Sequence, residues 1–238
     1  MNSDVKDTKT LLSEAEEKES VGDRLGYEKD SKERMPWEHY LKEFKGADPS
    51  VISNRLGIFY DIESQTFEFY FMGSTYYIHY PDFKVTHKND DRLCYPLEDS
   101  QYAKILITRY LLQACPTSFK GQFLSYRDIP WGEVYYRQFY GRCIGRLSRK
   151  YGNKIDLFEN VMEKLEAKKV EYGDIAYDLE FMKDLYIRFI IWQGDDEFSP
   201  SAQILFSDNF SSSFTAEDLA YVGDICMNTF AIVEKSIK

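Results

Sequence analysis

The chain has 238 residues, of which 43% are hydrophobic and 16% aromatic, so it is long enough to bury a full core. Its 40 acidic and 30 basic residues give a formal net charge of -10, which argues against nucleic-acid or anionic-membrane binding by the surface as a whole. No apolar segment reaches the roughly 20 residues of a membrane span, and the start of the chain lacks the apolar stretch of a signal peptide. The cysteines show neither CxxC pairing nor zinc-like spacing, which indicates reduced thiols and a cytoplasmic location: Cys94, Cys115, Cys143 and Cys226.

Residues 1–34 differ in composition from the rest of the chain. They contain ten acidic and seven basic residues and few large apolar side chains. Such a segment cannot bury enough apolar surface to fold by itself. We therefore expect a polar N-terminal extension over 1–34, followed by a single domain over 35–238.

The first half of that domain reads as one helix and a meander of strands. Apolar residues at helical spacing predict a helix from Pro36 to Gly46, and residues 48–50 are expected to form a turn. Alternation of apolar and polar residues then predicts strands over 59–62, 66–71, 75–80 and 83–87.

The second half mixes helices with further strands. Helices are expected over 97–114, 130–151, 156–167 and from Thr215 nearly to the end of the chain, and strands over 122–126, 175–181, 186–192 and 204–206. Gly132, Gly141 and Gly145 each weaken the 130–151 helix by about 1 kcal/mol relative to alanine, so close packing or a kink is expected there. The pattern indicates an α+β fold in which an antiparallel β-sheet packs against several α-helices.

The most distinctive stretch is residues 186–206, YIRFIIWQGDDEFSPSAQILF. An apolar run predicts a core strand that stops at Gly194, and a second run begins after Pro200. The loop between them carries three adjacent carboxylates, Asp195, Asp196 and Glu197.

This stretch resembles the signature of the domain of unknown function 3786 family. The resemblance rests on Trp192, the Gly-Asp-Asp-Glu-Phe run over 194–198, Pro-Ser-Ala over 200–202, Ile-Leu-Phe over 204–206 and the later block 215–219. Further blocks agree in the same order, at 110–112, Gly121 with 125–130, Gly132 with Tyr135 and Phe139, and 173–176. The similarity spans about residues 37–232. It implies a shared fold but no established activity, and some members are joined to iron-sulfur segments or occur near corrinoid proteins. This sequence lacks the four-cysteine cluster that an iron-sulfur segment needs.

The acidic loop has two interpretations. Asp195, Asp196 and Glu197 are candidates for binding a hard cation such as Mg²⁺ or Ca²⁺ that activates water, although the ligand spacing of calcium loops and the HExxH motif are both absent. In the structural interpretation, Asp195 or Asp196 caps its own turn, Glu197 pairs with Arg127 or Arg142, and Phe198 fills the core.

A ligand pocket is the second functional hypothesis. Turn, helix and loop residues together are predicted to line one aromatic pocket for an organic ligand with a flat face and charged edges. The alternative is that the aromatic side chains are simply core. The candidates are Arg127, Asp128, Tyr135, Tyr136, Phe139, Arg142, Trp192, Asp195, Asp196 and Glu197.

A cationic ridge is the third feature. Residues 120–155 hold eight basic and two acidic residues, whereas 156–238 hold seven basic and seventeen acidic ones. The ridge either pairs with the acidic C-terminal half or binds an anionic ligand or an acidic protein partner. Its members at helical spacing are Arg142, Arg146, Arg149 and Lys150.

Together these patterns favour a cytoplasmic binding or accessory module for a small organic or metallo-cofactor ligand. A metal-dependent hydrolase centred on 195–197 and a protein-protein interaction module remain as alternatives. The residues identify neither a cofactor nor a catalytic group, and whether the protein is an enzyme stays open.

Overall fold

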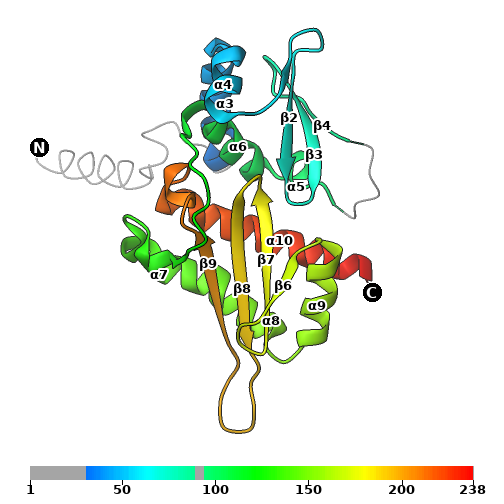
Figure 1. The fold of residues 1–238 in the computed structure, drawn as a ribbon, viewed down its shortest axis with the longest axis vertical. Coiled ribbons are helices and arrows are strands. Elements are labelled where there is room, and N and C mark those ends of the chain that lie inside the picture. The colour runs from blue at the N-terminus through cyan, green and yellow to red at the C-terminus, as the bar shows by residue number, and fades with distance from the viewer. Residues whose placement is uncertain (1–30, 89–93, 238) are drawn as a thin grey trace, which may run out of the picture. The chain divides into compact units, whose positions relative to one another are not determined.

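The computed structural model describes residues 31–88 and 94–237 (Figure 1). The chain divides into two compact units, residues 1–39 and 40–238, and helix α3 (Ser31–Gly46) runs across that boundary. This helix already begins at Ser31, before the expected start at Pro36. Most of the expected extension 1–34 lies outside the described residues, so its limits stay a prediction.

Within the described residues, nine strands form a single antiparallel sheet. The order is β4-β3-β2-β7-β8-β9-β5, with β1 paired to β2 and β6 paired to β7. The α+β fold with an antiparallel sheet is therefore confirmed. The strands are β1 (Tyr60–Asp61), β2 (Thr66–Phe71), β3 (Ser74–His79), β4 (Val85–His87), β5 (Phe123–Ser125), β6 (Lys168–Val170), β7 (Ile175–Met182), β8 (Leu185–Trp192) and β9 (Ser201–Ser207).

The sheet consists of two groups of strands that meet at one narrow joint. β2 and β7 share a single register pair, Phe71 with Met182, and the Met72 N–H donates to the Phe181 carbonyl at 2.9 Å. In contrast, β8 pairs with both β7 and β9 along most of its length. The strand that the sequence indicates most strongly is thus the centre of the larger group (Figure 1).

The helices mostly follow the sequence pattern, and two of the differences lie between residues 48 and 114. The expected turn at 48–50 is the start of α4 (Pro49–Leu56), because the Asp48 carboxylate accepts from the Ser50 N–H at 2.8 Å and caps it. The expected helix over 97–114 is divided into α5 (Pro96–Asp99) and α6 (Gln101–Gln113). Ser100 separates them because its side chain accepts from the Ala103 N–H at 3.2 Å and starts a new helix.

The helix predicted over 130–151 contains a π-helical turn at Gly141, a specific form of irregularity that the expected kink or close packing at its glycines did not define. It consists of α7 (Gly132–Phe139), a π-helical turn (Tyr140–Ile144) and α8 (Gly145–Tyr151). The close packing expected at its glycines is present at two of them. A Cβ on Gly132 would lie 1.8 Å from the Tyr126 carbonyl oxygen and one on Gly145 2.9 Å from Arg149 Nη1, whereas Gly141 has open space around it.

The last helix, α10 (Ala216–Ile237), crosses one face of the larger strand group (Figure 1). Phe230 on α10 meets Phe189 of β8 edge to face, with ring centroids 5.0 Å apart. The helix expected over 156–167 ends earlier, as α9 (Ile155–Lys164). The strand β6 begins at Lys168, directly after the expected end of this helix. It is short, contains two lysines and shows no alternation of apolar and polar residues.

Among the described residues, no helix combines the length and the apolar character that a membrane crossing requires.

Candidate functional site

The acidic loop between β8 and β9 is a self-contained turn. Asp195 Oδ1 accepts hydrogen bonds from the backbone N–H groups of Phe198 at 2.6 Å and Glu197 at 2.8 Å. The Asp195 N–H in turn donates to the Phe198 carbonyl at 2.9 Å. The donors from Phe198 and Glu197 lower the pKa of Asp195, because they stabilise its charged form. The predicted capping role is thus confirmed for Asp195.

Two other details of the structural interpretation are wrong. Phe198 does not fill the core, since 69% of it is exposed. Glu197 pairs with neither arginine, because Arg127 lies 3.3 Å from Glu133 and Arg142 is paired with Asp224. The strand register keeps Arg127 away from the loop. Ser125, two residues before Arg127, pairs with Leu205, and Leu205 lies roughly 13 Å along β9 from Ser201, the first residue after the loop.

The three carboxylates are not gathered into one cluster of ligands. Asp195, Asp196 and Glu197 line a shallow pocket together with Asn153 and Pro200. Within the ranges 31–88 and 94–237, no three His, Cys, Asp or Glu side chains come together in a way that could hold a metal ion. The geometry therefore gives no support to metal-assisted hydrolysis at this loop.

The ten candidate pocket residues are not brought together in one place. Phe139 is buried and stacks on Tyr126, with ring centroids 4.1 Å apart. Asp128 accepts from the Ser125 N–H at 3.0 Å and from its hydroxyl at 2.6 Å, so it caps its own short turn.

Of the remaining members, Arg127 and Tyr136 contact each other and the others lie elsewhere. The Arg127 guanidinium lies over the Tyr136 ring at 3.8 Å, on the surface. Trp192 ends β8 and is partly exposed, and of the set Tyr135 is the one that lines the cavity described below. The aromatic residues in this set therefore divide between core and surface.

The cationic ridge is paired with α10. Arg142 forms an ion pair with Asp224, and Lys150 Nζ lies 2.6 Å from Glu234. Arg146 Nη1 donates to Asn228 Oδ1 at 2.9 Å. Intramolecular pairing with the C-terminal half, one of the two expected alternatives, accounts for these three cations. Arg149 differs, because its Nη2 donates to the Gly141 carbonyl at 3.4 Å and its side chain is exposed.

A cavity of about 720 Å³ opens instead at the start of α10. Its walls come from α6, from the turn before α7 and the first turn of α7, and from residues 211–218. Most of the wall is apolar or aromatic, with Tyr110, Ile129, Pro130, Trp131, Val134, Tyr135, Phe214 and Ala216 among the lining residues. The volume is in the range typical of small-molecule sites.

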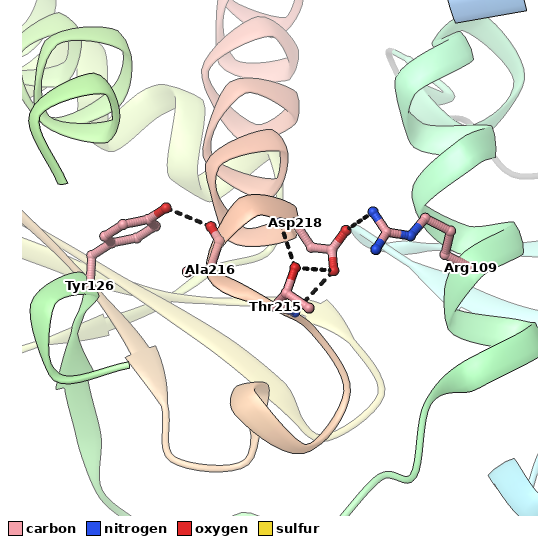
Figure 2. A network of polar contacts seen from close by, with 5 residues as sticks. All are labelled: Arg109, Tyr126, Thr215, Ala216 and Asp218. Carbon is pink, nitrogen blue, oxygen red and sulfur yellow. Dashed lines mark hydrogen bonds and ion pairs between the residues drawn. The ribbon is translucent and has the colours of Figure 1, made fainter. Parts of the chain in front are cut away.

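Thr215 and Asp218, which line this cavity, form a capping box (Figure 2). Asp218 Oδ2 accepts from the Thr215 N–H at 2.9 Å and from its hydroxyl at 2.7 Å, and Thr215 Oγ1 accepts from the Asp218 N–H at 3.3 Å. The sequence run Thr-Ala-Glu-Asp therefore sets the start of α10 at Ala216, as the predicted Thr215 cap requires.

Two distant side chains approach this first turn from opposite sides (Figure 2). Arg109 Nη1 on α6 lies 2.5 Å from Asp218 Oδ1, and Asp218 is only 4% exposed. The Tyr126 hydroxyl donates to the Ala216 carbonyl at 2.5 Å. A carboxylate is retained at such a depth only when it is paired and hydrogen-bonded, and Asp218 meets both conditions.

Two buried phenol groups near the cavity, Tyr110 and Tyr126, have raised pKa values. Burial raises the pKa of Tyr110 to about 12, although the positive charge of Arg55 opposes the shift. Burial also raises the pKa of Tyr126 above its ordinary range. Both groups are therefore neutral under physiological conditions.

Trp131 has an unusual backbone conformation at the rim of the cavity. Its φ of 66° lies in the left-handed region, which a bulky residue seldom adopts, yet its side chain is 76% exposed. The Gly132 N–H donates to the Ile129 carbonyl at 2.8 Å, which holds the turn. Val134, one turn further on, is 68% exposed and also lines the cavity.

A family model described as Domain of unknown function (DUF3786) matches residues 48–229. The chain belongs to this family. The matched span of the DUF3786 domain includes both the acidic loop and every residue that lines the cavity. The search of the curated proteins and the search of the solved structures both returned no match. The family description names no activity, so any function has to be argued from the site.

Sequence reasoning missed the cavity of this DUF3786 domain because its walls come from three separate segments. Two local signals were present. Arg109 is the only charged residue in the apolar run 105–112, and a charge at that position needs a buried partner. Trp131 lies between Pro130 and Gly132, a sequence typical of a tight turn that displays a side chain.

Proposed function

We propose that the protein is a cytoplasmic binding module for a small organic ligand with a flat face, and that the cavity at the start of α10 holds this ligand. The observation that carries the proposal is Trp131, a large aromatic side chain that lines the cavity while it stays mostly exposed. Its positive φ has a cost of order 1 kcal/mol or more, and residues in such conformations cluster at ligand sites.

The composition of the walls supports a flat, partly apolar ligand. Trp131 offers a ring face for stacking, while Val134, Ile129 and Phe214 offer apolar contacts. Arg109 and Asp218 supply a few fixed polar groups beside these apolar residues, a combination common in small-molecule sites.

Two further features agree with the proposed location and bear on the ligand class. All four cysteines are free thiols, which suits a reducing compartment. The family resemblance noted in the sequence implies a link to corrinoid proteins, so corrinoids are one class to include among the test compounds.

Thermal unfolding against a panel of aromatic small molecules and corrinoids tests the proposal. A ligand that binds only the native state at about 100 times its dissociation constant adds roughly 2.7 kcal/mol of stability and raises the midpoint. Val134→Arg places a long charged side chain in the cavity and should abolish the rise. Val51→Arg is the matched control, because Val51 is also an exposed valine on a helix, with 59% exposure, and does not line the cavity.

Three outcomes distinguish the possibilities. A rise that is lost in Val134→Arg and kept in Val51→Arg supports the cavity. A rise kept in both variants places binding on another surface. No rise with any compound contradicts the proposal.

A further inference from the structure

Resting on the proposed function, we infer that the ligand of the cavity at the start of α10 is an organic cation. The expected class is a flat aromatic molecule that carries an ammonium or another positively charged group. The inference depends on three features of the accessible wall: the uncompensated charge of Glu217, the occupied positive end of α10 and the aromatic side chains at the start of α7.

Glu217 gives the wall a negative charge that no base neutralises. The charged residues that line the cavity are Arg109, Asp218 and Glu217, so one base stands against two acids. Arg109 Nη1 lies 2.5 Å from Asp218 Oδ1, and these two charges compensate each other. Glu217 is exposed, and no base within 31–88 or 94–237 forms an ion pair with it. The carboxylate of Glu217 is therefore open to a ligand.

The positive end of α10 does not cancel this charge. A helix N-terminus carries roughly half a unit of positive charge. The Asp218 carboxylate already accepts from the Thr215 N–H at this end, and Thr215 Oγ1 accepts from the Asp218 N–H. An exposed acid in a first helical turn often serves helix stability alone. Glu217 indicates a ligand only because accessible aromatic side chains line the same cavity.

Those aromatic side chains come from the start of α7. Trp131 directly precedes this helix, and Val134 and Tyr135 follow it by three and four residues, a spacing that places side chains on one helical face. All three line the cavity, with Trp131 76% exposed and Tyr135 half-buried. The helix α7 packs against α10, which bears Glu217. The faces of aromatic rings attract cations, and tryptophan does so most strongly.

These groups together favour a cation over an anion. A positive group in the cavity contacts the ring faces of Trp131 or Tyr135 and is attracted by Glu217. A carboxylate in the same place faces Glu217 without a free base, because Asp218 already pairs with Arg109. The formal net charge of -10 on the chain also attracts cations from solution.

A set of probes that differ in charge but share one ring system tests the inference on the full chain. The probes are 1-naphthylmethylamine, which is a cation at pH 7, the neutral 1-naphthalenemethanol and the anion 1-naphthoate. Isothermal titration calorimetry at low salt measures each dissociation constant. The cation should bind on the order of tenfold more tightly than the alcohol, and the anion should bind most weakly.

Two matched variants assign the preference to Glu217. Glu217→Gln keeps the shape of the side chain and removes its charge, so cation binding should weaken roughly threefold while alcohol binding stays the same. Glu133→Gln is the control, because it also removes an exposed carboxylate but Glu133 does not line the cavity. It should leave the preference for the cation unchanged.

The outcomes separate this inference from the proposed function. If the alcohol or the anion binds as tightly as the cation and Val134→Arg abolishes this binding, the cavity binds ligands but the cation inference is wrong. A preference for the cation that Glu217→Gln leaves intact also overturns it. Val134→Arg should abolish binding of the neutral alcohol too, which a purely electrostatic effect of the new arginine would not do. If no probe binds in a way that Val134→Arg abolishes, the proposed function fails together with the inference.

Discussion

The acidic loop and the first turn of α10 use the same local chemistry in different surroundings. In each, an aspartate accepts two hydrogen bonds from its own turn: Asp195 from Glu197 and Phe198, and Asp218 from the backbone and hydroxyl of Thr215. Asp195 is exposed, whereas Asp218 is buried and faces Arg109 from another helix. The two turns therefore differ in their surroundings: segments distant in sequence enclose the turn at Asp218, which makes it a candidate site, and do not enclose the turn at Asp195.

The largest expected effect comes from removing the buried carboxylate. Asp218→Ala deletes the cap of α10 and leaves Arg109 without its ion-pair partner, so we expect a loss of about 3 kcal/mol in the free energy of unfolding. Urea denaturation measures it. Glu217→Ala, which removes the exposed acid next to it, is the control and should leave the midpoint almost unchanged. Equal losses in both variants would contradict the assigned role of Asp218.

The packing of the cavity rim gives the next largest effect. Gly132→Ala puts a Cβ against the Tyr126 carbonyl oxygen, and the resulting overpacking should cost about 2 kcal/mol in unfolding free energy. Gly141→Ala, in the same continuous helix but with open space around it, should instead stabilise by about 0.5 to 1 kcal/mol. Thermal and urea unfolding of the pair decide the point. A stable Gly132→Ala protein would show that the rim is not tightly packed.

The smallest effect is expected at the acidic loop and depends on pH. The pKa of Asp195 is lowered in the folded state, so its contribution is present above the ordinary pKa of about 4 and is lost as pH falls through the lowered value. The midpoint difference between the wild type and Asp195→Asn should therefore be constant above about pH 5 and shrink toward lower pH. Asp196→Asn is the control, because the two turn hydrogen bonds go to Asp195. A difference that grows on acidification would contradict this assignment.

The fold was largely predictable because its main signals are local. Neighbouring residues along the chain define β8, its end at Gly194 and the beginning of β9. The same holds for the Thr215 cap of α10. The π-helical turn after Phe139 and the lysine-rich β6 were not predictable, because helix packing and sheet edges decide them rather than periodicity.

The site was much less predictable, since exposure and long-range pairing leave little trace in the sequence. Phe198 and Trp131 are both aromatic residues beside turns, and nothing in composition indicates that both point outward. The partners Arg109 and Asp218 are far apart in the chain and meet only through the packing of α6 against α10. The metal-site hypothesis was placed at Asp195, Asp196 and Glu197 because their charges are adjacent in sequence.

The most direct test of the account uses two tryptophans as reporters. Trp131 lines the cavity and Trp192 ends the strand that leads into the acidic loop, so their indole N–H signals report on the two regions separately. The measurement is a ¹H–¹⁵N NMR titration with the compound that raises the unfolding midpoint most, with the signals assigned by Trp131→Phe and Trp192→Phe. The account predicts a saturable shift of the Trp131 signal and an unchanged Trp192 signal. A saturable shift of Trp192 with Trp131 unchanged would contradict it and return the function to the acidic loop.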